Sequence, residues 1–206
     1  PVIQHAAATA LAGGTHVDDV FLATAAVREA GGSPLVMTYW NLVLRRGVAR
    51  FAADLAAGGG AGLITPDLIP EEADDWIAAS DEHGLDRVFL VAPSSTPERL
   101  VKVTRASRGF VYAASTMGVT GARTSVDSHA RDLVERTRAV SDLPVCVGLG
   151  VSSGAQAAEL AAYADGVIVG SALVRTLTGD GELGDRLDAL RALTAELADG
   201  VRTGAR

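Results

Sequence analysis

Short apolar runs alternate with longer stretches of helical periodicity along the 206-residue chain. Continuous apolar, β-branched runs are typical of parallel strands that are covered on both faces. The pattern predicts strands at Pro34–Tyr39, Ala61–Asp67, Arg87–Pro93, Gly109–Ser115, Pro144–Gly150 and Ala164–Gly170.

Amphipathic segments flank these runs and predict helices. One helix start is marked by Ser95-Thr96-Pro97-Glu98, which supplies a capping hydroxyl, an early proline and a carboxylate in the first turn. The predicted helices are Val2–Ala12, Val17–Ala30, Leu42–Ala57, Glu71–His83, Pro97–Ser107, Ser128–Val140, Ser153–Tyr163 and a last one around Gly184–Ala198. In the last helix, the leucines recur at helical spacing as one apolar stripe: Leu183, Leu187, Leu190 and Leu197.

The strict alternation of strand and helix leaves two α/β architectures, an open doubly wound sheet and a (β/α)8 barrel. The chain opens on a helix with no strand before it. Two further βα units of roughly 60 residues ahead of Pro1 would bring the length close to the usual barrel size of about 250 residues. We therefore expect residues 1–206 to form a single domain, the C-terminal three quarters of a TIM barrel with strands 3 to 8.

Composition narrows the class of protein. With 48% hydrophobic and 21% charged residues the chain is expected to fold, and its net charge of −7 disfavours binding to nucleic acid. A single cysteine, Cys146, excludes an internal disulfide. No apolar run long enough to span a membrane and no secretory n-region is present, so we expect a cytoplasmic protein without a membrane partner.

Glycine-rich turns follow the last two predicted strands. One strand ends in Gly148-Leu149-Gly150, and the next ends in Gly170-Ser171. Glycine permits close backbone approach, and a helix start offers free N–H groups, so the two turns predict a phosphate site at the carboxyl ends of the strands. The alternative is a pair of ordinary tight turns.

A second glycine pair, Gly118 and Gly121 in Gly118-Val119-Thr120-Gly121, is placed to hinge a lid over that end of the barrel, although a merely mobile loop is the alternative. The remaining strand ends are apolar and predict a pocket for an aromatic substrate with a phosphate tail, although each residue also fits a core position. These residues are Met37, Tyr39, Ile64, Leu90, Leu149 and Ile168.

The sequence shows few signals for acid–base catalysis, metal binding or a bound cofactor. Asp67 is the only carboxylate at a predicted strand end, so general acid–base catalysis lacks a partner within these residues. The four histidines lie on or beside helices, and no Cys/His spacing predicts a metal site. We expect neither a metal nor a bound cofactor, and we interpret Cys146 as a small core residue.

Taken in order, several motifs resemble the α subunit of tryptophan synthase. They cover nearly the whole chain: Pro1-Val2-Ile3-Gln4, Tyr39-Trp40-Asn41-Leu42-Val43, Asp67-Leu68-Ile69-Pro70-Glu71-Glu72, Gly118-Val119-Thr120-Gly121, Gly148-Leu149-Gly150-Val151-Ser152 and Gly170-Ser171-Ala172.

The resemblance implies a (β/α)8 lyase that cleaves indole-3-glycerol phosphate to indole and glyceraldehyde 3-phosphate, and that passes indole to a pyridoxal-phosphate β subunit in an α2β2 complex. It implies phosphate binding by Gly121, Gly150, Gly170 and Ser171. It also implies that Thr120 supports a catalytic carboxylate, and that Asn41 and Asp67 face the β subunit. The implied indole pocket consists of Met37, Tyr39, Ile64, Leu90, Tyr112, Leu149 and Ile168.

The two catalytic acids of that family, a Glu and an Asp, precede the position that matches Pro1. We therefore expect them upstream of Pro1, and we expect the 206 residues alone to be inactive. Two other hypotheses remain: a different phosphate-binding barrel enzyme of amino-acid biosynthesis, and a non-catalytic module that activates the β subunit.

Overall fold

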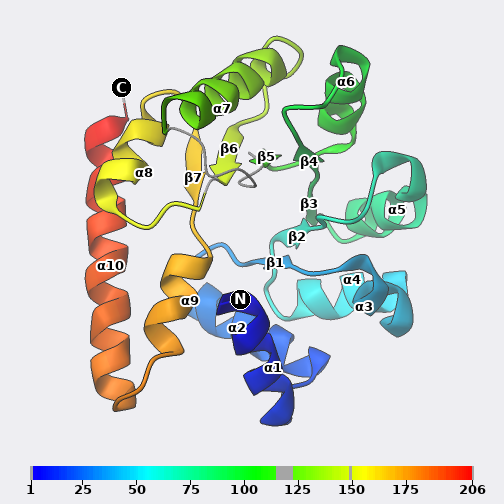
Figure 1. Ribbon diagram of the computed structural model, residues 1–206. Coiled ribbons are helices and arrows are strands. Elements are labelled where there is room, and N and C mark those ends of the chain that lie inside the picture. Colours follow the sequence, from blue (N-terminus) through cyan, green and yellow to red (C-terminus); the bar gives the residue numbers. More distant parts are fainter. Residues whose placement is uncertain (1, 115–122, 149, 206) are drawn as a thin grey trace.

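The computed structural model describes residues 2–114, 123–148 and 150–205, and side chains are not described for residues 123–128. Within these ranges short parallel strands lie at the centre and helices surround them (Figure 1). The strands are β1 Leu35–Met37, β2 Gly62–Ile64, β3 Asp86–Val88, β4 Leu90–Val91, β5 Val111–Ala114, β6 Val145–Gly148 and β7 Gly166–Ile168. The order is β1-β2-β3 in one sheet and β4-β5-β6-β7 in the other, and every neighbouring pair is parallel.

The described helices include the predicted ones in the predicted order and one, α9, that was not predicted. They are α1 Val2–Ala12, α2 Val17–Glu29, α3 Trp40–Arg46, α4 Val48–Ala57, α5 Asp74–Glu82 after the 3-10 turn η1 Pro70–Glu72, α6 Pro97–Ala106, α7 Arg123–Arg138, α8 Gly154–Ala161, α9 Ser171–Leu177 and α10 Leu183–Gly204. The predicted cap of α6 is confirmed, because Thr96 Oγ1 accepts a hydrogen bond from Arg99 N at 3.2 Å. No described helix is long and apolar enough to cross a membrane.

The prediction of one strand at Arg87–Pro93 was wrong, since the segment is divided between the two sheets at Phe89. Successive carbonyls of a strand point to opposite sides. The Val88 carbonyl accepts from Thr65 N, next to β2, whereas the Phe89 carbonyl accepts from Tyr112 N in β5. Hydrogen bonding to the first sheet therefore ends at Val88, and hydrogen bonding to the second sheet begins at Phe89.

The predicted single helix Leu42–Ala57 was also wrong, because Gly47 interrupts it. Gly47 has φ 92° and ψ 127°, a conformation outside the helical region that glycine adopts without a steric penalty. Its N–H still bonds to Val43 O and Leu44 O, and its carbonyl accepts from Phe51 N. Gly47 thus ends α3 and begins α4 in a single residue.

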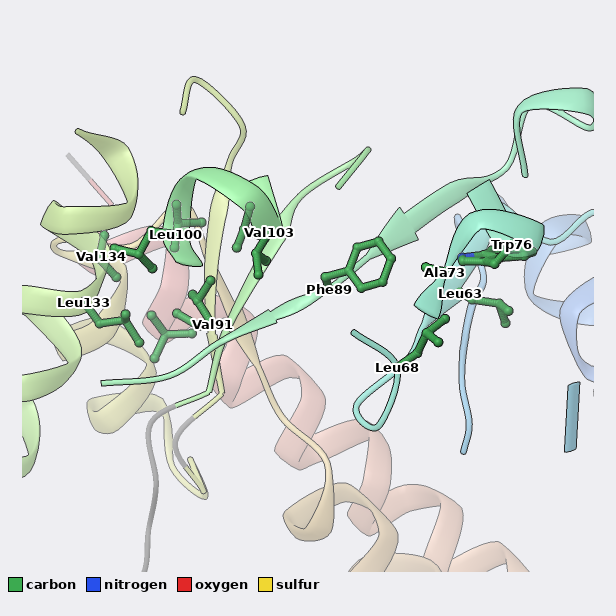
Figure 2. Close-up of a cluster of buried hydrophobic side chains, with 14 of the residues drawn as sticks. Leu63, Leu68, Ala73, Trp76, Phe89, Val91, Leu100, Val103, Leu133 and Val134 are labelled. Atoms are coloured by element: carbon green, nitrogen blue, oxygen red, sulfur yellow. The ribbon is translucent and has the colours of Figure 1, made fainter. Parts of the chain in front are cut away.

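The core lies between the strands and the surrounding helices. Phe89 is 1% exposed and Trp76 of α5 is fully buried. In Figure 2, Phe89 lies between a group around Trp76 and a group around Leu100 and Val103 of α6, so one continuous layer of apolar side chains joins the two sheets. On the strands other than β3 this layer contains alternate residues, and the intervening residues face the opposite side of the sheet.

Candidate functional site

The residues on the inner face of the strands form rows that the strand register defines. In the three-stranded sheet, Met37 pairs with Ile64, and Ile64 pairs with Val88. Paired residues of parallel strands point to the same face. The neighbours Val36, Leu63 and Phe89 belong to the layer under the helices, so the row of Met37 and Ile64 faces the inside.

Two further rows cross the four-stranded sheet. The first joins Leu90, Tyr112, Cys146 and Gly166, and the second joins Ala114, Gly148 and Ile168. Five predicted pocket residues therefore share the inner face: Met37, Ile64, Leu90, Tyr112 and Ile168.

The exposure of these side chains is uneven. Ile64 is 9% exposed, and Leu90, Tyr112 and Ile168 are half-buried, whereas Met37 is 53% exposed. Tyr39 lies after β1 as the N-terminal cap residue of α3 and is 67% exposed. Met37 and Tyr39 are thus more exposed than the other described residues of the predicted pocket. Leu149 lies outside the described residues.

The ring of Tyr112 leans over Gly148 on the neighbouring strand. A Cβ atom built on Gly148 would lie only 2.1 Å from Tyr112 Oη, so only glycine leaves room for the ring. Burial raises the pKa of the Tyr112 hydroxyl. Burial, and then the charge of Asp165, raises the pKa of the neighbouring Cys146 thiol to about 11, which keeps it protonated near neutral pH.

The turns after β6 and β7 are side by side, since Gly148 pairs with Ile168 and both Gly150 and Gly170 follow two residues later. Gly150 has φ 64°, which favours glycine. Gly170 precedes α9, and no side chain of the described residues caps this helix. The first N–H groups of α9, beginning at Ser171, are therefore available to a ligand.

The start of α8 differs, and the expectation of bare N–H groups at both helix starts was wrong here. Ser153 Oγ accepts from Gln156 N at 3.4 Å, and Gln156 Oε1 accepts from Ser152 N at 2.9 Å. The carboxylate of Glu196, from α10, accepts from Gly154 N at 2.7 Å. The N–H groups of Ser152, Gly154 and Gln156 are thus bonded within the chain.

Asp67 and Asn41 are both exposed. The two carboxylate oxygens of Asp67 accept from Trp40 N at 2.9 and 3.1 Å, which caps the start of α3 from 27 residues away. The bond holds the loop after β2 against the segment after β1. Among the described residues at strand ends, Asp67 remains the only carboxylate, and its hydrogen bonds assign it a structural role.

The remaining predictions concern the Gly118–Gly121 segment, the histidines and metal binding. The phosphate ligand Gly121, the supporting residue Thr120 and the whole Gly118–Gly121 segment lie outside the described residues. The histidines lie on helices or at their ends, as predicted: His5, His16, His83 and His129. In the part of the chain that is described, no group of three or more His, Cys, Asp or Glu residues is arranged to hold a metal ion.

The sequence did not reveal two interactions at this end of the barrel. It did not predict that Asp67 caps α3, and it did not single out Glu196 at all. Asp67 caps α3 from 27 residues away, so no local capping signal pointed to it. None existed for Glu196, which lies 42 residues from its partner in sequence.

Known proteins are similar to this chain in sequence and in fold. A family model described as "Tryptophan synthase alpha chain" matches residues 1–202. The tryptophan synthase alpha chain of Nocardia farcinica is 66% identical over 203 residues, which cover 98% of this chain and 74% of that protein.

Solved structures agree. A structure of Mycobacterium tuberculosis tryptophan synthase superposes with a TM-score of 0.88 at 64% identity, covering 98% of this chain and 75% of that one. The tryptophan synthase A-subunit of Pyrococcus furiosus gives a TM-score of 0.84 at 32% identity, covering 96% of this chain and 79% of that one. The TIM-barrel prediction is confirmed, and the chain belongs to the tryptophan synthase alpha chain family.

Proposed function

We propose that the protein acts in tryptophan biosynthesis as the lyase that splits indole-3-glycerol phosphate into indole and glyceraldehyde 3-phosphate. The observation that carries this proposal is the pair of adjacent turns at Gly150 and Gly170, next to the apolar inner face of the strands. The high identity to alpha chains favours this activity over that of another phosphate-binding barrel enzyme.

The phosphate group is proposed to bind at the start of α9. Backbone N–H groups at Gly170 and Ser171, with the Ser171 hydroxyl, would donate to phosphate oxygens, and Gly150 would let the backbone approach from the neighbouring strand. The positive end of the helix dipole adds attraction for the anion. Gly121 is proposed to contribute a further N–H.

The indole ring is proposed to lie on the inner face of the strands. Leu90, Tyr112 and Ile168 are half-buried there, and Ile64 is paired with Met37 on the same face. Burial of an aromatic ring against such side chains is strongly favourable. Tyr39 and Leu149 complete the proposed set.

Cleavage is a retro-aldol reaction. One group must take the proton from the substrate hydroxyl while the carbon–carbon bond to the indole ring breaks, and another must manage the indole nitrogen and deliver a proton to the ring carbon. Asp67 is committed to capping α3, so it supplies neither group. We propose that a Glu and an Asp outside the 206-residue chain perform these steps, with Thr120 in support.

The partner is proposed to be a tryptophan synthase β subunit in an α2β2 complex. Asn41 and Asp67 would face it, because the bond from Trp40 N to Asp67 brings the segments after β1 and β2 together. Leu42 and Ile69, which are 40% and 41% exposed, flank the same two segments. Their apolar surface would be covered in the complex.

The cleavage itself is proposed to need no cofactor, and pyridoxal phosphate would act only in the β subunit. We further propose that the protein works in the cytoplasm as one domain.

Indole release from indole-3-glycerol phosphate tests the proposal. The protein from the complete reading frame is assayed beside the 206-residue chain, each with and without β subunit. Release by the longer form only supports the lyase, with its acids outside these residues. No release by either form refutes the lyase, and faster β-subunit turnover without cleavage would instead indicate an activating module.

A further inference from the structure

Helix α10 packs against α8 through one face that carries Glu196, Gly200 and Gly204 at intervals of four residues. The two helices lie side by side at the edge of the molecule (Figure 1). A Cβ atom on Gly200 would lie 2.1 Å from the Gly154 carbonyl oxygen, and one on Gly204 would lie 2.1 Å from the Ala158 carbonyl oxygen. The helices therefore touch backbone to backbone.

This close approach brings Glu196 to the start of α8. One helical turn before Gly200, the Glu196 carboxylate accepts a hydrogen bond from Gly154 N at 2.7 Å. A Cβ atom on Gly154 would lie 2.6 Å from the Glu196 carbonyl oxygen, so Gly154 is also fixed from the side. A hydrogen bond from an N–H to a carboxylate is among the stronger ones in proteins.

The segment from Gly150 to Gly154 is therefore held at its far end. Gln156 Oε1 binds Ser152 N and Ser152 Oγ, at 2.9 and 3.1 Å, from within α8. Glu196 of α10 adds a hydrogen bond from a different element, and Val151, which is 3% exposed, packs into the core beside Gly150. Gly150, at its near end, has φ 64°, a left-handed conformation that favours glycine.

We propose that Glu196 is a positioning residue for substrate binding: through Gly154 N it fixes the Gly150–Gly154 turn against α10 and so holds Gly150 in place for the substrate phosphate. This inference rests on the proposed function. It gives the C-terminal helix α10 a role in substrate affinity.

Steady-state kinetics of indole release by the full-length protein test the proposal, with inorganic phosphate as a competitive probe. Glu196→Ala removes the acceptor, Glu196→Gln keeps an amide oxygen at the same length, and Asp199→Asn is the control on the same helix. Asp199 pairs with Arg202 and is well exposed. A urea unfolding curve of each variant measures the fraction that is folded.

We expect Glu196→Ala to raise both the KM and the inhibition constant of phosphate about tenfold, with kcat changed less than about twofold, because a charge-assisted hydrogen bond is lost. Glu196→Gln and Asp199→Asn are expected to stay within about twofold of the wild type.

An unchanged KM in folded Glu196→Ala, or a loss confined to kcat or to stability, overturns the inference. So does a Glu196→Gln variant as impaired as Glu196→Ala, because the hydrogen bond would then not be the cause. If the wild type releases no indole, the proposed function itself fails, and that outcome is distinct from these.

Discussion

Substituting Gly148 by alanine places a methyl group where the Tyr112 ring lies. The added Cβ would be 2.1 Å from Tyr112 Oη, 2.6 Å from Cζ and 2.7 Å from Cε1. Ordinary contact begins at 3.4 Å, so the hydroxyl must retreat by at least about 1.3 Å. The backbone at Gly148 does not resist the change, since its φ is not positive.

The displaced ring changes activity more than stability. Tyr112 Oη is the far end of a half-buried side chain, so the ring can swing aside, and the loss of stability should stay near the low end of overpacking costs, about 1 kcal/mol. The swing moves the proposed indole wall by about 1 Å. A misplacement of that size lowers kcat/KM by up to about a hundredfold, and we expect a fall of at least roughly tenfold.

Two assays measure the effect: kcat/KM for indole release by the full-length protein, and urea unfolding. Gly184→Ala is the matched control, because nothing lies within 4 Å of its added Cβ. In a Tyr112→Leu background, the further loss caused by Gly148→Ala should shrink to less than about twofold, because the clashing ring is gone. The same factor in both backgrounds, or wild-type kinetics for Gly148→Ala, would falsify the reasoning.

Two further predictions concern stability. Gly200→Ala should destabilise the protein by about 3 kcal/mol, because its Cβ meets the Gly154 carbonyl oxygen at 2.1 Å and backbone cannot swing aside; Gly184→Ala on the same helix should be neutral or stabilising by up to about 1 kcal/mol, and equal urea midpoints for the two variants would contradict this. Hydrogen bonds from Lys102 and then Arg99 lower the pKa of Glu71 from 4.5 to about 2. A carboxyl group with a lowered pKa stabilises the fold at pH values above its ordinary pKa, so the advantage of wild type over Glu71→Gln should persist from pH 7 to about 4.5 and vanish as the pH falls towards 2. If urea unfolding shows a stability difference that does not depend on pH, these ion pairs are not the source of that difference.

The candidate site was predictable where its signals are local. Apolar runs placed the strands, and the glycines that follow them placed the turns at Gly150 and Gly170 at the correct ends. The apolar strand ends placed Ile168 on the inner face and the family resemblance placed Tyr112 there, and the strand register puts both on that face. Local patterns carry this information, since they depend on residues only a few positions apart.

Contacts between distant residues decided the rest. The hydrogen bond of Asp67 to Trp40 N spans 27 residues and that of Glu196 to Gly154 N spans 42, and no periodicity records either partner. The same holds for the Val88 and Phe89 carbonyls, whose bonds to different neighbours divide one predicted strand between two sheets. By itself the sequence determined most of the elements and their order, because short-range sterics and burial of apolar faces suffice for that, but it did not show the divisions at Gly47 and Phe89 or the short helix α9. Only the tertiary structure decided which helix start remains open to an anion, since this depends on whether a side chain from another element reaches its N–H groups.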